Sequence, residues 1–175
     1  MTYEPLILGP YPTKYAHEFN AGVHRRLKKM VGAMYCIGLW SGAEMRGLAI
    51  VGRPKARKLD VQARTRVKVQ EVLRVAVVEG TRNGCSMLYG ACSKAGKAMG
   101  LDGMMTYIHD DETGVSLKAA GWVKDKVTSG GEWTRETRQR GLVEDNKPKV
   151  RWWAPWSLQL QAATENEAAT HKAAE

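Results

Sequence analysis

The chain has 175 residues, of which 43% are hydrophobic, and this suits one domain with one sizeable core. No apolar stretch approaches the roughly 20 residues of a membrane span, and the N-terminus lacks a positive region followed by an apolar run, so we expect a cytoplasmic protein. The net charge is +9, or +11 through Trp156 because the last nineteen residues carry −2. An excess of positive charge attracts nucleic acid or the phosphates of a nucleotide cofactor. The alternative is a basic protein that binds neither.

The first predicted element is a helix over residues 13–29. Thr13 is a good N-cap, and apolar side chains recur every four residues after it. The opposite face of this helix is basic and carries His24 and Arg25. That face is therefore a candidate contact surface for a polyanion.

A β-hairpin is predicted next. Apolar runs at residues 34–39 and 45–51 flank a Ser-Gly-Ala turn, and this pattern is typical of two paired strands. Arg53-Pro54 ends the second strand, because proline cannot donate to the strand ladder. The basic residues 55–66 then form a predicted connection.

The centre of the chain predicts a strand, a turn and a helix in succession. Residues 71–78 are rich in branched apolar side chains and predict a central strand, and residues 79–84 are a turn cluster. A helix over residues 86–99 ends at Gly100. A further strand is predicted at residues 103–108.

The remaining elements become less regular toward the C-terminus. Acidic residues 110–112 are predicted to start a short helix that Gly121 ends, and residues 122–127 predict a strand. Residues 128–156 are basic and rich in tryptophan, and we expect an ordered but irregular extension. The Ala/Gln/Glu-rich tail from residue 157 onward is predicted to be a frayed helix or disordered.

The turn before the central helix is a candidate phosphate site. A helix N-terminus presents unpaired backbone N–H groups and a partial positive charge, which favour a bound phosphate. Gly84 would let the backbone approach a pyrophosphate, Arg82 adds charge, and the Ser86 hydroxyl can donate a hydrogen bond. An ordinary strand-to-helix turn is the alternative. The predicted binding segment is Arg82, Asn83, Gly84, Cys85 and Ser86.

This strand, turn and helix resemble those of the GCN5-related N-acyltransferases (GNAT). Residues 72–77 and the turn up to Ser86 resemble the core strand and pyrophosphate loop, and residues 115–122 resemble a later GNAT segment ending in glycine and an aromatic residue. The resemblance covers residues 34–127. It implies an α/β (α+β) fold whose mixed, mostly antiparallel sheet is flanked by helices. It also implies acetyl-CoA or another acyl-CoA as cofactor, held partly by backbone groups of Val75, Ala76 and Val77.

The GNAT resemblance implies a single domain over residues 1–156, with its core at residues 34–127, an extension at 128–156 and a tail at 157–175. Several strings are similar to GNAT-like phage and prophage proteins related to the Mom DNA-modification proteins; they include residues 83–90, 116–122, 130–133 and 149–152. That branch implies modification of adenine in phage DNA, in the host cytoplasm.

Two positions depart from the GNAT pattern. Thr81 and Ser86 replace the arginine or glutamine and the glycine or alanine of the pyrophosphate motif, so only Gly84 matches. Leu117 falls near the tyrosine that many GNAT enzymes use to protonate the departing thiolate, and leucine cannot donate a proton. Either another residue serves as the acid or the chemistry differs.

Amine acylation needs a base and an acid, and the chain offers candidates for both. Glu71, at the start of the central strand, is the candidate base; an ion pair with Arg74 is the structural alternative. Tyr107 and Ser86 are candidate acids, with a core tyrosine as the alternative for Tyr107. His17 and His24 share a helix face, and a metal there is possible but not favoured.

The acceptor is predicted to be a DNA base. Cations of the C-terminal extension can neutralise phosphates while indole rings stack on bases, although a flap whose tryptophans cover the sheet is the alternative. The predicted substrate-contacting residues are His24, Arg25, Arg53, Arg74, Trp133, Arg135, Arg138, Arg140, Lys149, Arg151 and Trp152.

Two other functions remain open on the sequence alone. One is a GNAT enzyme that acylates a protein lysine or a small-molecule amine, and the other is a non-catalytic module that binds CoA or DNA. The three cysteines, Cys36, Cys85 and Cys92, match neither a disulfide framework nor a zinc site, so we expect reduced, buried thiols.

Overall fold

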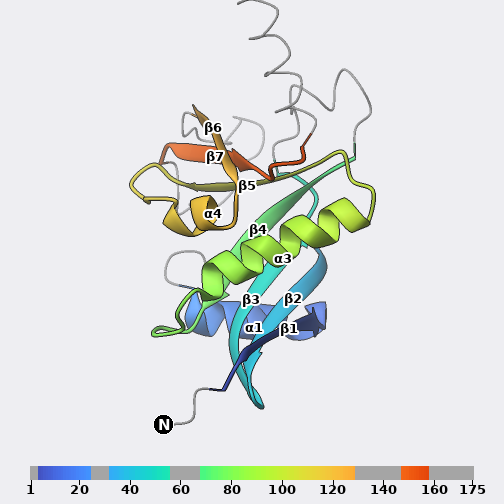
Figure 1. Ribbon diagram of the computed structural model, residues 1–175, viewed down its shortest axis with the longest axis vertical. Coiled ribbons are helices and arrows are strands. Elements are labelled where there is room, and N and C mark those ends of the chain that lie inside the picture. The colour runs from blue at the N-terminus through green and yellow to red at the C-terminus, as the bar shows by residue number, and fades with distance from the viewer. Residues whose placement is uncertain (1–3, 25–31, 56–67, 129–146, 158–175) are drawn as a thin grey trace, which may run out of the picture.

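The computed structural model describes residues 4–24, 32–55, 68–128 and 147–157. In these residues seven strands form one sheet with the order β1-β2-β3-β4-β5-β7-β6 (Figure 1). The strands are β1 (Leu6–Tyr11), β2 (Ala33–Ser41), β3 (Glu44–Gly52), β4 (Val69–Val77), β5 (Gly103–His109), β6 (Val123–Thr128) and β7 (Lys149–Trp153). The helices are α1 (Thr13–Val23), α3 (Gly84–Ala98) and α4 (Val115–Ala119).

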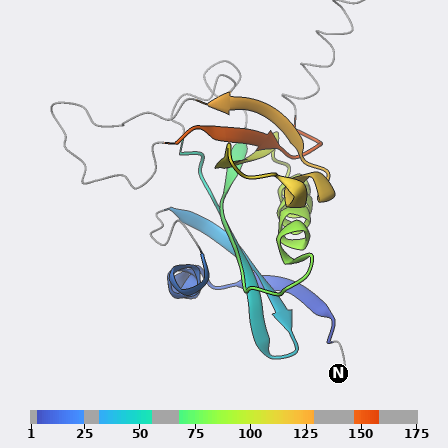
Figure 2. The same cartoon turned by 90° about the vertical axis from the view of Figure 1, so that its left-hand side faces the viewer.

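The sheet is mixed but mostly antiparallel, as predicted. Among the described strands only β4 and β5 pair in parallel, and α3 is the crossover that connects them. The β2–β3 hairpin turns at Gly42, whose φ of 55° lies in the left-handed region that glycine adopts at low cost. Figure 2 shows α1 on one face of the sheet and α3 on the other. These two sides are called the α1 face and the α3 face below.

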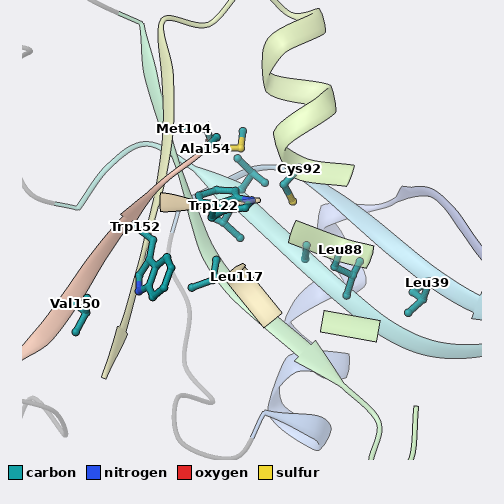
Figure 3. Packing of buried hydrophobic residues seen from close by; sticks show 12 residues of the cluster. Leu39, Leu88, Cys92, Met104, Leu117, Trp122, Val150, Trp152 and Ala154 are labelled. Atoms are coloured by element: carbon teal, nitrogen blue, oxygen red, sulfur yellow. The ribbon is translucent and has the colours of Figure 1, made fainter. Parts of the chain in front are cut away.

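The main core lies between the sheet and α3. Leu88 and Cys92 are four residues apart on α3, so both point at the sheet, and both are fully buried. Leu117 from α4 and Trp122 extend this core toward β7, as Figure 3 shows. A smaller cluster on the α1 face joins Ala16 of α1 to β2 and β3. The elements around β4 are therefore fixed on both faces.

Three predicted boundaries differ from the structure. α1 ends at Val23 and His24 is already extended, whereas residues 25–31 lie outside the described residues. α4 begins only at Val115, after Gly114 with φ 65°, so the acidic residues 110–112 lie in the preceding turn and do not start the helix. β1 was not predicted; it is an edge strand, where Pro10 needs no ladder partner on its outer side.

The predicted irregular extension contains a regular strand. β7 inserts between β5 and β6 with antiparallel pairing to both. The expectation of irregular structure is thus wrong for Lys149–Trp153, and residues 129–146 lie outside the described part of the chain. Ser157, assigned to the tail from sequence, is buried, and its hydroxyl accepts a hydrogen bond from the Met104 N–H at 3.2 Å. The tail beyond it is not described.

No helix in the described ranges has both the length and the apolar character that crossing a bilayer requires. All three cysteines are free thiols, as expected. Cys36 and Cys92 are buried, whereas Cys85 in the first turn of α3 is only partly buried.

Candidate active site

β4 and β5 separate halfway along their length. Their parallel pairing runs from Val69 and Gly103 to Val72 and Thr106, after which β4 continues beside β3 and β5 continues beside β7. At the last pair the Thr106 hydroxyl donates to the Val72 carbonyl at 2.9 Å. We call the divergence beyond this pair the splay.

A β-bulge accounts for the splay. Ile50 lies opposite Arg74 and Val51 opposite Val72, so Leu73 is an extra residue in β4. Such a bulge bends its strand and increases the local twist. It therefore turns the second half of β4 away from β5, which has no corresponding irregularity in its pairing with β7.

The backbone of β4 beyond the bulge offers hydrogen-bonding groups to the splay. The Val78 N–H donates to the Arg46 carbonyl at 2.8 Å, so Val78 faces β3. Alternate residues of an antiparallel strand face the same neighbour, and Ala76 therefore also faces β3. Val75 and Val77 face the opposite side, from which β5 has moved away. Of the three predicted backbone positions, two are directed into the splay and Ala76 is not.

The predicted phosphate turn leads directly into α3. Asn83 has φ 60° and ψ 3°, a left-handed conformation at the N-cap, and its carbonyl accepts the first helical bond from the Met87 N–H at 3.0 Å. The amides of Cys85 and Ser86 lie in the first turn, where backbone N–H groups have no acceptor within the helix. Arg82 and Asn83 are exposed. The turn is therefore open to an anion at its tip.

Gly84 and Ser86 make contacts within the protein that were not predicted from the sequence. A Cβ at Gly84 would lie 2.7 Å from the Val77 side chain, so glycine is needed for α3 to start close against the end of β4. Its N–H donates to the Thr81 carbonyl at 3.3 Å. The Ser86 hydroxyl donates to the Asn83 carbonyl at 2.9 Å. A phosphate at this turn would thus meet backbone amides first, and Ser86 would have to rotate to contribute its hydroxyl.

Comparison with solved structures identifies the fold of the chain. No protein-family model matches the sequence, and no curated protein matches it. Among solved structures, the ribosomal-protein-S18-alanine N-acetyltransferase of Escherichia coli superposes with a TM-score of 0.57 at 11% identity, covering 87% of this chain and 95% of that one. A Drosophila melanogaster polyamine N-acetyltransferase gives 0.59 at 10% identity, covering 85% and 98%. A Bacillus subtilis acetyltransferase in complex with CoA gives 0.52 at 12% identity, covering 86% and 97%.

The chain has the GNAT fold. In this chain the fold comprises the mixed sheet, the central strands β4 and β5 that diverge, and the turn into α3 at the end of β4. The Leu117 side chain is 1% exposed and belongs to the core. Leucine has no proton to donate.

Glu71 lies at the vertex of the splay, on the α1 face. It is 5% exposed, and its carboxylate accepts the Lys55 backbone N–H at 2.8 Å. Burial raises the pKa of Glu71, and this hydrogen bond together with the charges of Lys55, Arg74 and Lys149 opposes the rise. A carboxylate with a raised pKa takes up a proton more readily than an exposed one.

Tyr107 lies on the same face, on β5. Met105 is paired with Glu71, and side chains two residues apart point to the same side of a strand. Burial raises the pKa of Tyr107, Arg151 opposes the rise by its charge and by a hydrogen bond, and the charge of Glu71 adds to it. Arg151 is itself fixed, because it pairs with Asp125 at 2.5 Å and stacks over the Trp153 ring, 5.2 Å from its centroid.

His24 lies near Arg74 on the same side of the splay. Burial, together with the charges of Arg74 and His109, lowers its pKa to about 4. The imidazole is therefore neutral at pH 7. The structure thus gathers six predicted residues around the splay on the α1 face: His24, Glu71, Arg74, Tyr107, Lys149 and Arg151.

Other predicted substrate residues lie elsewhere or are not described. Trp152 is 3% exposed and packs in the core of the α3 face, so its ring covers the sheet and is not available to a base (Figure 3). Arg53 is exposed just after β3. Outside the described residues are Arg25, Trp133, Arg135, Arg138 and Arg140. Within the described ranges, no cluster of three or more histidine, cysteine, aspartate or glutamate side chains is arranged to hold a metal ion.

Sequence reasoning missed two residues beside Glu71. Lys55 supplies a backbone hydrogen bond to Glu71 from a basic segment that has no periodic pattern. Thr106 closes the vertex of the splay through its hydrogen bond to the Val72 carbonyl.

Proposed function

We propose that the chain is an acyl-CoA-dependent N-acyltransferase. The observation that carries this proposal is the splay itself, which combines outward-directed backbone groups at Val75 and Val77 with a buried carboxylate, Glu71, at its vertex. The open first turn of α3 lies beyond the end of the same strand. A catalyst of amine acylation needs these three parts together: donors for an oxyanion, a base, and a cradle for the cofactor phosphates.

The residues of the chain fit an acyl-CoA, which supplies the activated acyl group. The amides of Cys85 and Ser86 and the exposed Arg82 would bind its pyrophosphate at the N-terminus of α3. The Val75 and Val77 backbone would orient the acyl arm and stabilise negative charge on the carbonyl oxygen. Glu71 would accept the proton of the attacking amine, either directly or through a water.

A DNA base is the acceptor we propose. The chain carries a net charge of +9, and Arg74, Lys149 and Arg151 lie on the face of the splay that holds Glu71. Such a face attracts a phosphodiester backbone. The exocyclic amine of adenine is inaccessible inside a duplex, so the base would have to be flipped or single-stranded. A phage-encoded, Mom-like role follows only if DNA is the acceptor.

Acetyl-CoA is expected to stabilise the protein against heat. A ligand that binds only the folded state adds about 2.7 kcal/mol at about a hundred times its Kd, because the folded state is favoured by mass action. The melting temperature with and without acetyl-CoA measures this. Desulfo-CoA, which lacks only the thiol of CoA, is the comparison ligand that tests binding of the nucleotide and pantetheine parts alone. An unchanged melting temperature with both would contradict the proposed cofactor.

DNA isolated from cells that express the protein is expected to contain a modified adenine nucleoside. Digestion to nucleosides followed by mass spectrometry measures the added mass, and the Glu71→Gln variant is the control that should leave the DNA unmodified. If the DNA is unmodified while purified protein acetylates a lysine peptide or a small primary amine, the acceptor is not DNA. If CoA binds and no acceptor is acylated, the chain is a binding module.

A further inference from the structure

The strand β6 contains a bulge opposite Arg151. Between two neighbouring pairs of the β6–β7 ladder, β6 advances by three residues, from Lys124 to Val127, whereas β7 advances by two. Asp125 and Lys126 therefore both lie opposite Arg151. A bulge of this kind re-aims a side chain of the strand that carries it. Here it directs the Asp125 carboxylate at Arg151.

The Asp125 carboxylate holds the Arg151 side chain. A single oxygen, Oδ2, accepts from the Arg151 Nε at 2.5 Å and from the Trp153 indole N–H at 2.9 Å. The guanidinium also lies over the Trp153 ring, 5.2 Å from its centroid. An arginine that is anchored in this way has little rotamer freedom left to lose when a ligand binds.

Arg151 lies on the α1 face, on the same side of the sheet as Glu71. Tyr107 of β5 is paired with Arg151. Met105, two residues earlier on the same strand and the same face, is paired with Glu71. Two strand spacings and a shift of two residues place the Cα atoms of Glu71 and Arg151 roughly 12 Å apart. The two side chains can therefore engage different ends of one acceptor molecule.

The chemistry of Arg151 suits a phosphate. The bond to Asp125 uses Nε, which is one of five N–H donors of an arginine. The terminal Nη groups are the end of the planar fork that binds phosphate through two parallel hydrogen bonds. The side chain is largely buried, with 11% of its surface exposed, and a charge-assisted hydrogen bond is stronger in such surroundings than in water. Lys149, two residues earlier on the same face of β7, adds positive charge.

We propose that Arg151, positioned by Asp125, binds the phosphate that flanks the acceptor base of single-stranded DNA, while the base itself reaches Glu71. This inference rests on the proposed DNA acceptor. It gives Arg151 a contact with the substrate and makes Asp125 a positioning residue. An ion pair that only joined β6 to β7 would stabilise the sheet without contributing to DNA binding.

The salt dependence of DNA binding measures the phosphate contact. A fluorescent single-stranded oligonucleotide of about 12 nucleotides is titrated with purified protein between about 50 and 200 mM salt, and anisotropy gives the Kd. Arg151→Gln is expected to weaken binding by about 10- to 100-fold and to reduce the slope of log Kd against log salt by about 0.7, because one phosphate contact is lost. Arg151→Lys keeps the charge without the planar fork and should also bind more weakly than the wild type.

Two variants of Asp125 separate positioning from charge. Asp125→Ala removes both hydrogen bonds, so it is expected to weaken DNA binding although it removes a negative charge. Asp125→Asn is the matched variant, because its one amide oxygen can still accept from both Arg151 and Trp153. It should bind DNA at least as tightly as the wild type. If charge alone mattered, both variants would bind more tightly and to the same extent.

Lys124→Gln is the control for net charge. Lys124 is exposed and is paired with Trp152, whose ring lies on the α3 face, so this variant loses one positive charge on the opposite side of the sheet. Its DNA affinity should stay close to that of the wild type. Melting temperatures and the thermal shift with acetyl-CoA verify that each variant is folded, and if Asp125→Ala does not fold, the Arg151 and Lys124 variants still decide the question.

The outcomes separate this inference from the proposed function. Equal losses of DNA affinity in Arg151→Gln and Lys124→Gln, or equal tightening in both Asp125 variants, would overturn the roles of Arg151 and Asp125 and leave the DNA acceptor standing. A wild-type protein that does not bind the oligonucleotide at low salt would overturn this inference and the DNA acceptor together. A thermal shift with acetyl-CoA would in that case still support acyl transfer to another amine.

Discussion

Glu71→Gln is expected to lower kcat/KM for acyl transfer by about 10²- to 10⁴-fold, the usual contribution of a positioned base. Glutamine has nearly the same shape and can still accept the Lys55 N–H through its amide oxygen, but it cannot take up a proton. The loss should fall on kcat and not on the KM for acyl-CoA, since Glu71 lies on the α1 face and the proposed cofactor cradle begins at α3. Steady-state kinetics with the acceptor that the nucleoside and amine assays reveal measures both constants.

The pH dependence follows from the direction of the Glu71 pKa. Burial raises it above the ordinary value of about 4.3, so the carboxyl is protonated and inactive as a base over a wider acidic range. The acidic limb of the wild-type kcat/KM profile should therefore lie above pH 4.3, and Glu71→Gln should lack this limb. An acidic limb at the ordinary glutamate value would contradict the assignment.

The contribution of Glu71 to stability changes with pH in the direction opposite to activity: activity rises with pH, whereas this contribution falls. Because the folded-state pKa of Glu71 is raised, its contribution to the free energy of unfolding is present below the unfolded-state pKa and is lost as pH rises through the folded-state value. Glu71→Gln should thus be at least as stable as the wild type at pH 7. Glu44→Gln, at an exposed carboxylate on β3, is the matched control and should change neither activity nor its pH profile.

The local parts of this fold could be predicted from the sequence. The hairpin of β2 and β3 and the order of β4, turn and α3 are encoded by apolar runs separated by turn residues, and both are as predicted apart from a few residues at their ends. The GNAT resemblance was carried by the same segments. Glu71 was a candidate base because it begins the central strand, where it could act directly or through a water.

The pairing of distant strands could not be predicted in the same way. The bulge at Leu73 exists only in the register between β3 and β4, and no local pattern shows it. β7 joins the sheet between β5 and β6 although it follows β6 in the chain, so its tryptophans appeared to belong to an extension. Trp152 and Trp153 are core residues for that reason, and their buried rings cannot stack on a base. For these two residues the alternative holds in which tryptophans cover the sheet.

Gly84 shows a second limit. A glycine in a strand-to-helix turn permits a close approach, but the sequence does not say of what; here it is the Val77 side chain. The role of this glycine therefore depends on a neighbour brought in by tertiary structure.

Ser86→Asp is expected to weaken CoA binding by on the order of 10²- to 10³-fold while leaving the fold intact. A carboxylate placed about 4 Å from a phosphate repels it by about 4 kcal/mol at an effective dielectric constant of about 20, and each 1.4 kcal/mol is about a tenfold change in Kd. The same carboxylate in the first turn of α3 interacts favourably with the N-terminal end of the helix dipole. The melting temperature without ligand should therefore stay the same or rise.

A loss of affinity for CoA without a loss of thermal stability distinguishes an anion-binding site from a turn with a structural role only. Thr13→Asp is the control, because it adds the same charge to the first turn of α1, on the other face of the sheet. It should leave the Kd for CoA unchanged at moderate salt, since exposed charges beyond about 8–10 Å are screened. Equal losses of affinity in both variants would mean that only the net charge of the protein attracts CoA. An unchanged Kd in Ser86→Asp would show that the diphosphate does not bind at the start of α3. This result would contradict the proposed acyl-CoA site.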